Sequence, residues 1–181
     1  MLLLILGLVL WATIHFWKRI APDHRAGFGD KGKIVVAVGL VVAIVLMVTG
    51  YKAAQGTVYW GRTAPMTGIN NLLMVLAFYV FATSAAQTKL TKYIRHPQLT
   101  AVMLFAVAHL LVNGDTPSFV LFGGLFVWAA AEVVVINRVN GPRGPYQAVP
   151  MKKEITAVIV TIVVVAVVAV IHQALGYNPF G

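Results

Sequence analysis

Six long apolar segments constrain this chain more than any other feature of its sequence. An α-helix rises about 1.5 Å per residue, so roughly 17–25 apolar residues cross a hydrocarbon core about 30 Å thick. The segments are Leu2–Trp17, Ile34–Tyr51, Met66–Ala86, Gln98–Asn113, Pro117–Ile136 and Ile155–Gly176. The pattern predicts an all-α integral membrane protein, a six-transmembrane-helix bundle that forms one domain over residues 1–181.

The composition agrees with a membrane location. Hydrophobic residues make up 60% of the chain and charged residues 10%, and the mean hydropathy is +0.86. A soluble domain has roughly a quarter of its residues charged. The chain contains no cysteine, which excludes disulfides, thiolate ligands, iron–sulfur clusters and a cysteine nucleophile.

The positions of the basic residues predict the orientation in the membrane. Of the 14 lysines and arginines, all but Lys52 and Arg62 lie in the loops that follow the first, third and fifth segments. By the positive-inside rule these three loops are cytoplasmic, so both termini lie on the outer side. The net charge of +9 therefore reflects topology and attraction to anionic membrane lipids. We expect no nucleic-acid partner, and the oligomeric state is open.

Two histidines are expected inside the membrane. His109 is expected about 15–20 Å above the inner surface, near mid-membrane, and His15 about 5–8 Å inside the inner boundary. Ionisable residues within spans are rare and usually functional, and neutral imidazole is a common ligand of metals and haem iron. The alternative for both is a hydrogen bond between helices. His96 precedes His109 by about 20 Å of helix, so these two cannot share a metal ion.

Glu132 is the only acidic residue inside a predicted span. It lies about one turn from the inner end of the fifth segment, where a carboxylate needs a partner. His15, Arg95, His96 and Arg19 are expected at the same depth, which predicts an inner polar cluster of Glu132, His15, Arg95 and His96. The alternative is that the carboxylate reaches the inner headgroups. Two polar residues of the third segment, Asn70 and Asn71, are expected to join helices.

Three stretches, IHFWKRIAPDHRAGFGDKGK, RHPQLTAVMLFAVAHLLVNGD and LFGGLFVWAAAEVVVINR, resemble the NnrU family of bacterial membrane proteins over most of the chain. That resemblance implies a multi-pass protein of the bacterial inner (cytoplasmic) membrane. The chain is also similar to 15-cis-zeta-carotene isomerase, a haem b membrane enzyme. The resemblance implies a haem b cofactor with His15 and His109 as iron ligands, and the inner polar cluster adds Arg95, His96 and Glu132 to the expected cofactor site. Each ligand ring is expected to donate its second N–H to a neighbour: Glu132 for His15, and a backbone carbonyl or an outer polar group such as Asn70 or Asn71 for His109.

The resemblance also implies what such a protein does. It would act in nitrogen-oxide (denitrification-related) metabolism on a small redox ligand, or as a haem-dependent cis-trans isomerase of a lipid-soluble polyene. Ala106 stands where the isomerase has a redox-linked cysteine, so a thiolate ligand switch is not expected. One alternative is a non-enzymatic membrane sensor or assembly factor with structural histidines. A remote alternative, suggested by the sequence motifs RHP and YQAVP, is a methyltransferase-like relative. Whether His15 or His172 pairs with His109 is open.

Overall fold

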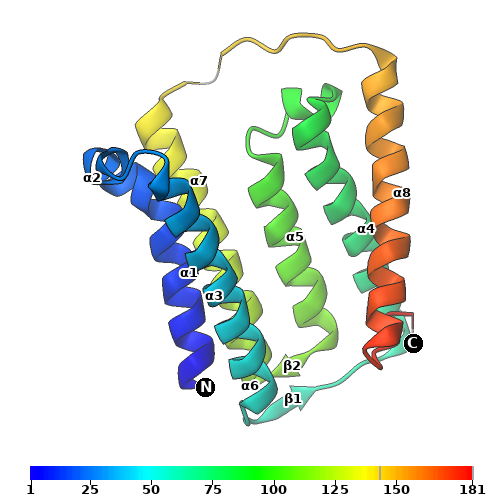
Figure 1. Cartoon of the computed structure of the whole chain (residues 1–181). Coiled ribbons are helices and arrows are strands. Elements are labelled where there is room, and N and C mark those ends of the chain that lie inside the picture. The colour runs from blue at the N-terminus through cyan, green and yellow to red at the C-terminus, as the bar shows by residue number, and fades with distance from the viewer. Residues whose placement is uncertain (143, 181) are drawn as a thin grey trace. The chain divides into compact units, whose positions relative to one another are not determined.

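The computed structural model describes residues 1–142 and 144–180 (Figure 1). Five helical stretches in this part of the chain are long and apolar enough to cross a membrane: α1 (Leu2–Ile20), α3 (Lys31–Ala53), α4 (Ala64–Ala86), Thr116–Asn140 and α8 (Met151–Ala174). The sixth apolar helix, α5 (Pro97–Val112), has 16 residues. The helical, membrane-type architecture is confirmed, while the sixth span and the outer location of both termini stay predictions.

The stretch Thr116–Asn140 is not one regular α-helix. It begins with α6 (Thr116–Ser118), continues as a π-helical turn (η2, Phe119–Gly123) and ends as α7 (Gly124–Asn140). The Asp115 side chain caps its start by accepting hydrogen bonds from the Ser118 backbone N–H and hydroxyl, both at 2.9 Å. A π-helical turn holds one extra residue per turn, so it rotates the face that α7 presents.

Short elements join the long helices. The loop after α1 contains α2 (Pro22–Gly27), and a 3₁₀ turn, η1 (Lys89–Lys92), precedes α5. Strand β1 (Val58–Trp60) pairs with β2 (Gly114–Asp115) in a two-stranded sheet. The predicted all-α fold lacked this small sheet, since segments of three and two residues are too short to show a strand pattern.

The chain divides into two compact units. The first comprises Met1–Tyr59 with Gly114–Gly141, and the second comprises Trp60–Asn113 with Pro142–Gly181. In the first unit α1 packs against α3 and α7, and in the second α4 packs against α5 and α8 (Figure 1). Each unit therefore contains three of the six predicted spans, arranged around one central helix.

Small residues bring α1 and α3 together in the first unit. A Cβ atom on Gly7 would lie 2.8 Å from the Met47 backbone nitrogen, and one on Gly50 would clash with the backbone of Leu4. Ala43, at the same interface, is fully buried. Close approach of backbones at glycine and alanine is how helices associate in lipid, because burying apolar side chains there gains little over contact with lipid tails.

The helix directions within each unit match the predicted alternation of spans. In the first unit Gly50 meets Leu4, so α3 runs antiparallel to α1, whereas Leu8 meets Gly124 and Arg19 meets Glu132, so α7 runs parallel to α1. In the second unit the start of α8 meets the end of α4, because Glu154 accepts a hydrogen bond from the Lys89 backbone N–H at 2.6 Å. These directions are those that the predicted topology requires.

Reporter fusions test the topology directly. Fusions after Arg25, Thr91 and Arg143 are expected to score as cytoplasmic, and fusions after Gln55 and at Gly181 as external, because of the unequal distribution of basic residues. Arg143 and Gly181 lie outside the described residues. A cytoplasmic signal at Gly181 together with an external signal at Gln55 would contradict the six-span prediction.

Candidate functional site

His15 lies on a face of α1 that points at α7. Trp11, His15 and Arg19 follow one another at intervals of four residues, and Trp128 and Glu132 have the same spacing on α7. Side chains four residues apart lie on one face of a helix. Because the two helices run parallel, the two tryptophans lie at one level, and Arg19, two turns after Trp11, reaches Glu132, one turn after Trp128.

Two indole rings enclose the imidazole of His15. The ring centroid of His15 lies 4.4 Å from that of Trp11 and 4.7 Å from that of Trp128. The two indoles meet edge to face, with centroids 5.4 Å apart and an interplanar angle of 78°. This geometry is the favoured one for aromatic pairs, and it restricts the orientation of the imidazole.

The hydrogen bond of His15 determines which ring nitrogen is available. Nδ1 lies 2.9 Å from the Trp11 carbonyl oxygen, which only accepts, so Nδ1 carries the proton and Nε2 carries the lone pair. A metal-ligating histidine commonly fixes its tautomer in this way. The sequence had suggested Glu132 as the acceptor for His15, and that was wrong. A carbonyl four residues earlier on the same helix is closer at hand than a carboxylate on another helix.

Glu132 is buried, and its partner is Arg19. The carboxylate side chain is 8% exposed and lies 3.9 Å from Arg19 Nε, while the Arg19 side chain is 25% exposed. Arg19 also donates a hydrogen bond of 3.3 Å to the side-chain oxygen of Asn140. The alternative in which Glu132 reaches the headgroups is therefore wrong. The arginine, at the end of its helix, is the partly exposed member of the pair.

Three buried polar atoms at this place have no hydrogen-bond partner among the described residues: Trp11 Nε1, Trp128 Nε1 and Glu132 Oε2. Leaving such an atom unpaired costs about 1–3 kcal/mol. In native structures these exceptions often mark a bound group. Two are donors and one is an acceptor, so a ligand with carboxylate or other acceptor atoms would satisfy the two indoles.

His109 lies in the second unit, on α5. Its Nδ1 lies 2.9 Å from the Phe105 carbonyl oxygen, and its ring centroid lies 4.2 Å from that of Phe105. The prediction that a backbone carbonyl fixes this ring is confirmed, and Nε2 again carries the lone pair. His172, on α8 of the same unit, has the same arrangement, with Nδ1 2.8 Å from the Val168 carbonyl oxygen.

The two units divide the predicted inner cluster between them. His15 and Glu132 belong to the first unit, and Arg95, His96 and His109 belong to the second. Arg95 and His96 are half-buried, and His96 is the N-cap residue of α5 without a capping side-chain hydrogen bond. The structure thus brings Glu132 together with Arg19 and His15 together with Trp128. The predicted cluster of Glu132 and His15 with Arg95 and His96 stays a prediction.

The two asparagines of α4 differ in their roles. With its amide nitrogen turned toward α5, Asn70 donates a 2.9 Å hydrogen bond to the Ala108 carbonyl, and only 6% of the residue is exposed. The prediction that Asn70 joins helices is therefore confirmed. Asn71 instead lines a pocket at the start of α4.

Sequence reasoning missed the two tryptophans around His15. Their signal was available, because Trp11 precedes His15 by four residues and Trp128 precedes Glu132 by four. What the sequence did not contain was the pairing of these two helices. Among the described residues, no group of three histidine, aspartate or glutamate side chains could hold a metal ion.

Comparison with known proteins gives one informative result. Residues 3–179 match the family described as NnrU protein, a match that covers nearly the whole chain and every candidate residue named above. No curated protein and no solved structure matches the chain. The similarity to zeta-carotene isomerase stays a prediction.

Proposed function

The chain belongs to the NnrU family, and from this premise we propose that it is a haem b-binding protein of the bacterial inner membrane. His15 and His109 are the residues proposed to hold the haem iron. The observation that carries the proposal is the surroundings of His15, where two indole N–H groups and one carboxylate oxygen are buried without partners. The two indole N–H groups are donors that a bound group with acceptor atoms would satisfy.

The residues present fit a haem group. His15 and His109 each have Nδ1 bonded to a carbonyl four residues earlier, so each has Nε2 as the nitrogen for a metal. Trp11 and Trp128 have N–H groups suited to carboxylates such as haem propionates, and Arg19, beside Glu132, supplies a cation. When bound, haem would supply a redox-active iron whose potential depends on its ligands and on burial. The protein's own part is to orient both rings and to exclude water.

Nitrogen-oxide metabolism is the activity we propose first, with a small redox ligand as the substrate class. Ala106 is fully buried three residues before His109, and a methyl group cannot ligate iron. A ligand switch through a thiolate at that position therefore has no chemical basis here. Cis-trans isomerisation of a lipid-soluble polyene is the second candidate activity, favoured by the apolar surface of the membrane-spanning helices.

A visible absorption spectrum of the detergent-purified protein, oxidised and then reduced, tests the proposal. Two neutral imidazole ligands predict a six-coordinate, low-spin haem with sharp bands on reduction. Extraction into alkaline pyridine should identify haem b. Protein purified from haem-replete cells without such a spectrum would contradict the proposal.

A further inference from the structure

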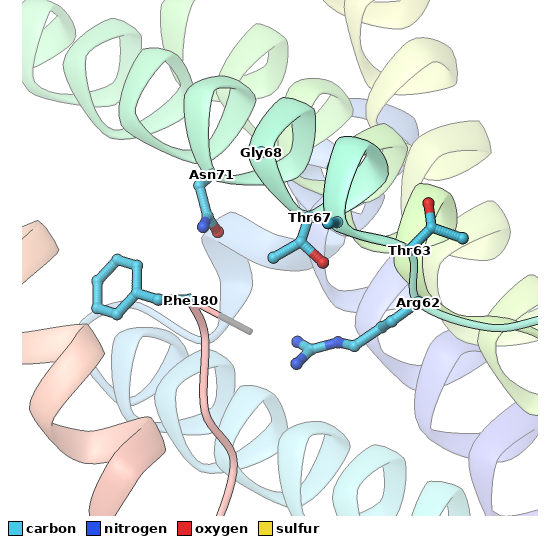
Figure 2. A pocket seen from close by; sticks show the side chains of 7 residues that line it. Arg62, Thr63, Thr67, Gly68, Asn71 and Phe180 are labelled. Carbon is cyan, nitrogen blue, oxygen red and sulfur yellow. The ribbon is translucent and has the colours of Figure 1, made fainter.

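A pocket of about 420 Å³ lies at the start of α4 in the second unit. Its volume is within the roughly 300–1,000 Å³ that small-molecule sites occupy. Figure 2 shows the Arg62 guanidinium, the Thr67 hydroxyl and the Asn71 amide turned toward the same space, with the Phe180 ring at its edge. None of these residues belongs to the proposed haem site, so this inference does not depend on it.

Thr67 differs from the other threonines of the long helices. The hydroxyls of Thr13, Thr49, Thr156 and Thr161 each donate to the carbonyl four residues earlier, at 2.7–2.8 Å. Thr67 is 6% exposed, yet its hydroxyl makes no hydrogen bond to any described residue and is directed into the pocket (Figure 2). Although Thr67 as a residue is largely buried, its hydroxyl opens onto the pocket, where it can donate to a bound group.

Arg62 gives the pocket a positive charge. It is one of only two basic residues on the predicted outer side, against twelve on the inner side, so the orientation of the protein does not explain it. No carboxylate among the described residues forms an ion pair with Arg62, whose Nη1 donates to the Asn178 carbonyl oxygen at 2.7 Å. The guanidinium has further N–H donors for an anion. The positive end of the α4 dipole adds to this charge.

The location of the pocket indicates where the anion comes from. Trp60, just before Arg62, donates a hydrogen bond to the Leu110 carbonyl oxygen at 3.1 Å and so holds the loop against α5. Tryptophan and tyrosine gather at the membrane–water interface, and Tyr59 and Trp60 place the pocket at that level. Phe180, 61% exposed, offers an apolar surface to a lipid chain.

We propose that this pocket binds a phosphate group, with Arg62 and Thr67 as its donors, and that the source is the headgroup of an anionic phospholipid. Arginine recognises phosphate through two parallel N–H bonds. The hydroxyl of Thr67 supplies a further donor from the adjacent helix turn. The volume exceeds what a free phosphate ion fills, which favours a headgroup with its glycerol.

Native mass spectrometry of the full-length protein in detergent, titrated with phosphatidylglycerol, tests this site. Arg62→Gln is expected to weaken binding of the first lipid about tenfold, because it removes a charge-assisted pair of hydrogen bonds. Thr67→Val, which keeps the shape and removes the hydroxyl, is expected to weaken it about threefold, and Thr67→Ser is expected to restore it. Inorganic phosphate and the zwitterionic lipid phosphatidylcholine are titrated in the same way, for comparison with phosphatidylglycerol.

The matched controls are Lys52→Gln and Thr49→Val. Lys52 is the other outer basic residue and lies in the first unit, and the Thr49 hydroxyl is already bonded within α3, so both variants should bind like the wild type. Displacement of phosphatidylglycerol by inorganic phosphate supports a phosphate site open to a soluble source, and its absence supports the lipid. Equal binding by wild type, Arg62→Gln and Thr67→Val would overturn the proposal. So would an equal loss in Lys52→Gln, which would indicate general surface attraction.

Discussion

Replacing His109 with alanine is expected to abolish the low-spin haem spectrum of the purified protein, or to convert it to a high-spin one. The imidazole has Nδ1 committed to the Phe105 carbonyl, so the proposed bond to iron uses Nε2, and alanine has no atom that replaces it. If haem is bound as proposed, loss of one of its two protein ligands would give a high-spin spectrum or loss of haem. The measurement is the reduced spectrum together with haem content per protein.

The same change at His15 is expected to have the same effect, and two other histidines serve as controls. His24 is exposed and accepts a 3.0 Å hydrogen bond from Trp17 Nε1, so His24→Ala should leave the spectrum unchanged. His172→Ala should do so as well. The structure makes the His172 control decisive, because His172 and His109 share one unit. Loss of the spectrum in His172→Ala but not in His15→Ala would show that His172 is the second ligand.

Hydropathy predicted the long helices well but could not predict how they pack. Every predicted span corresponds to a helix or helical stretch whose ends differ by a few residues, as with the extension of α1 from Trp17 to Ile20. Helices in lipid are apolar on every side, so no polar face shows which side meets a neighbour. The residues that do mark the contact, such as Gly7 and Gly50, are small rather than apolar, and their partners become known only from the structure.

The sequence predicted the depth of the candidate site residues in the membrane, but not the direction in which their side chains point from each helix. Counting residues along a helix gives the height of a side chain, and this correctly placed Glu132 at the level of Arg19. It gives no information about which of several basic residues at that height lies opposite, since this depends on helix rotation. The π-helical turn at Phe119–Gly123 adds to the difficulty. It changes the rotation of α7 just before Trp128 and Glu132, and no residue pattern signals it.

The second large effect concerns the Arg19–Glu132 pair, where removing the two partners should have unequal costs. Arg19→Met keeps most of the side-chain packing but leaves the buried Glu132 carboxylate without a cation, which costs about 3–5 kcal/mol. The carboxylate can instead take up a proton, and for an ordinary glutamic acid that costs about 3–4 kcal/mol at pH 7. The loss should therefore approach 3 kcal/mol at pH 7 and fall to about 1 kcal/mol at pH 5.

Glu132→Gln should be nearly neutral by comparison, at about 1 kcal/mol or less. It leaves Arg19, whose side chain is 25% exposed and keeps its bond to Asn140, so that charge stays solvated.

The double variant Arg19→Met/Glu132→Gln should recover most of the stability that Arg19→Met loses, because no buried charge remains. Lys18→Met removes an exposed cation beside Arg19 and should change stability by less than about 0.5 kcal/mol. The free energy of unfolding in detergent is measured for these four variants at pH 7 and pH 5. Equal losses of stability in Arg19→Met and Glu132→Gln would contradict the expected difference between them, since they would mean that both charges are equally buried.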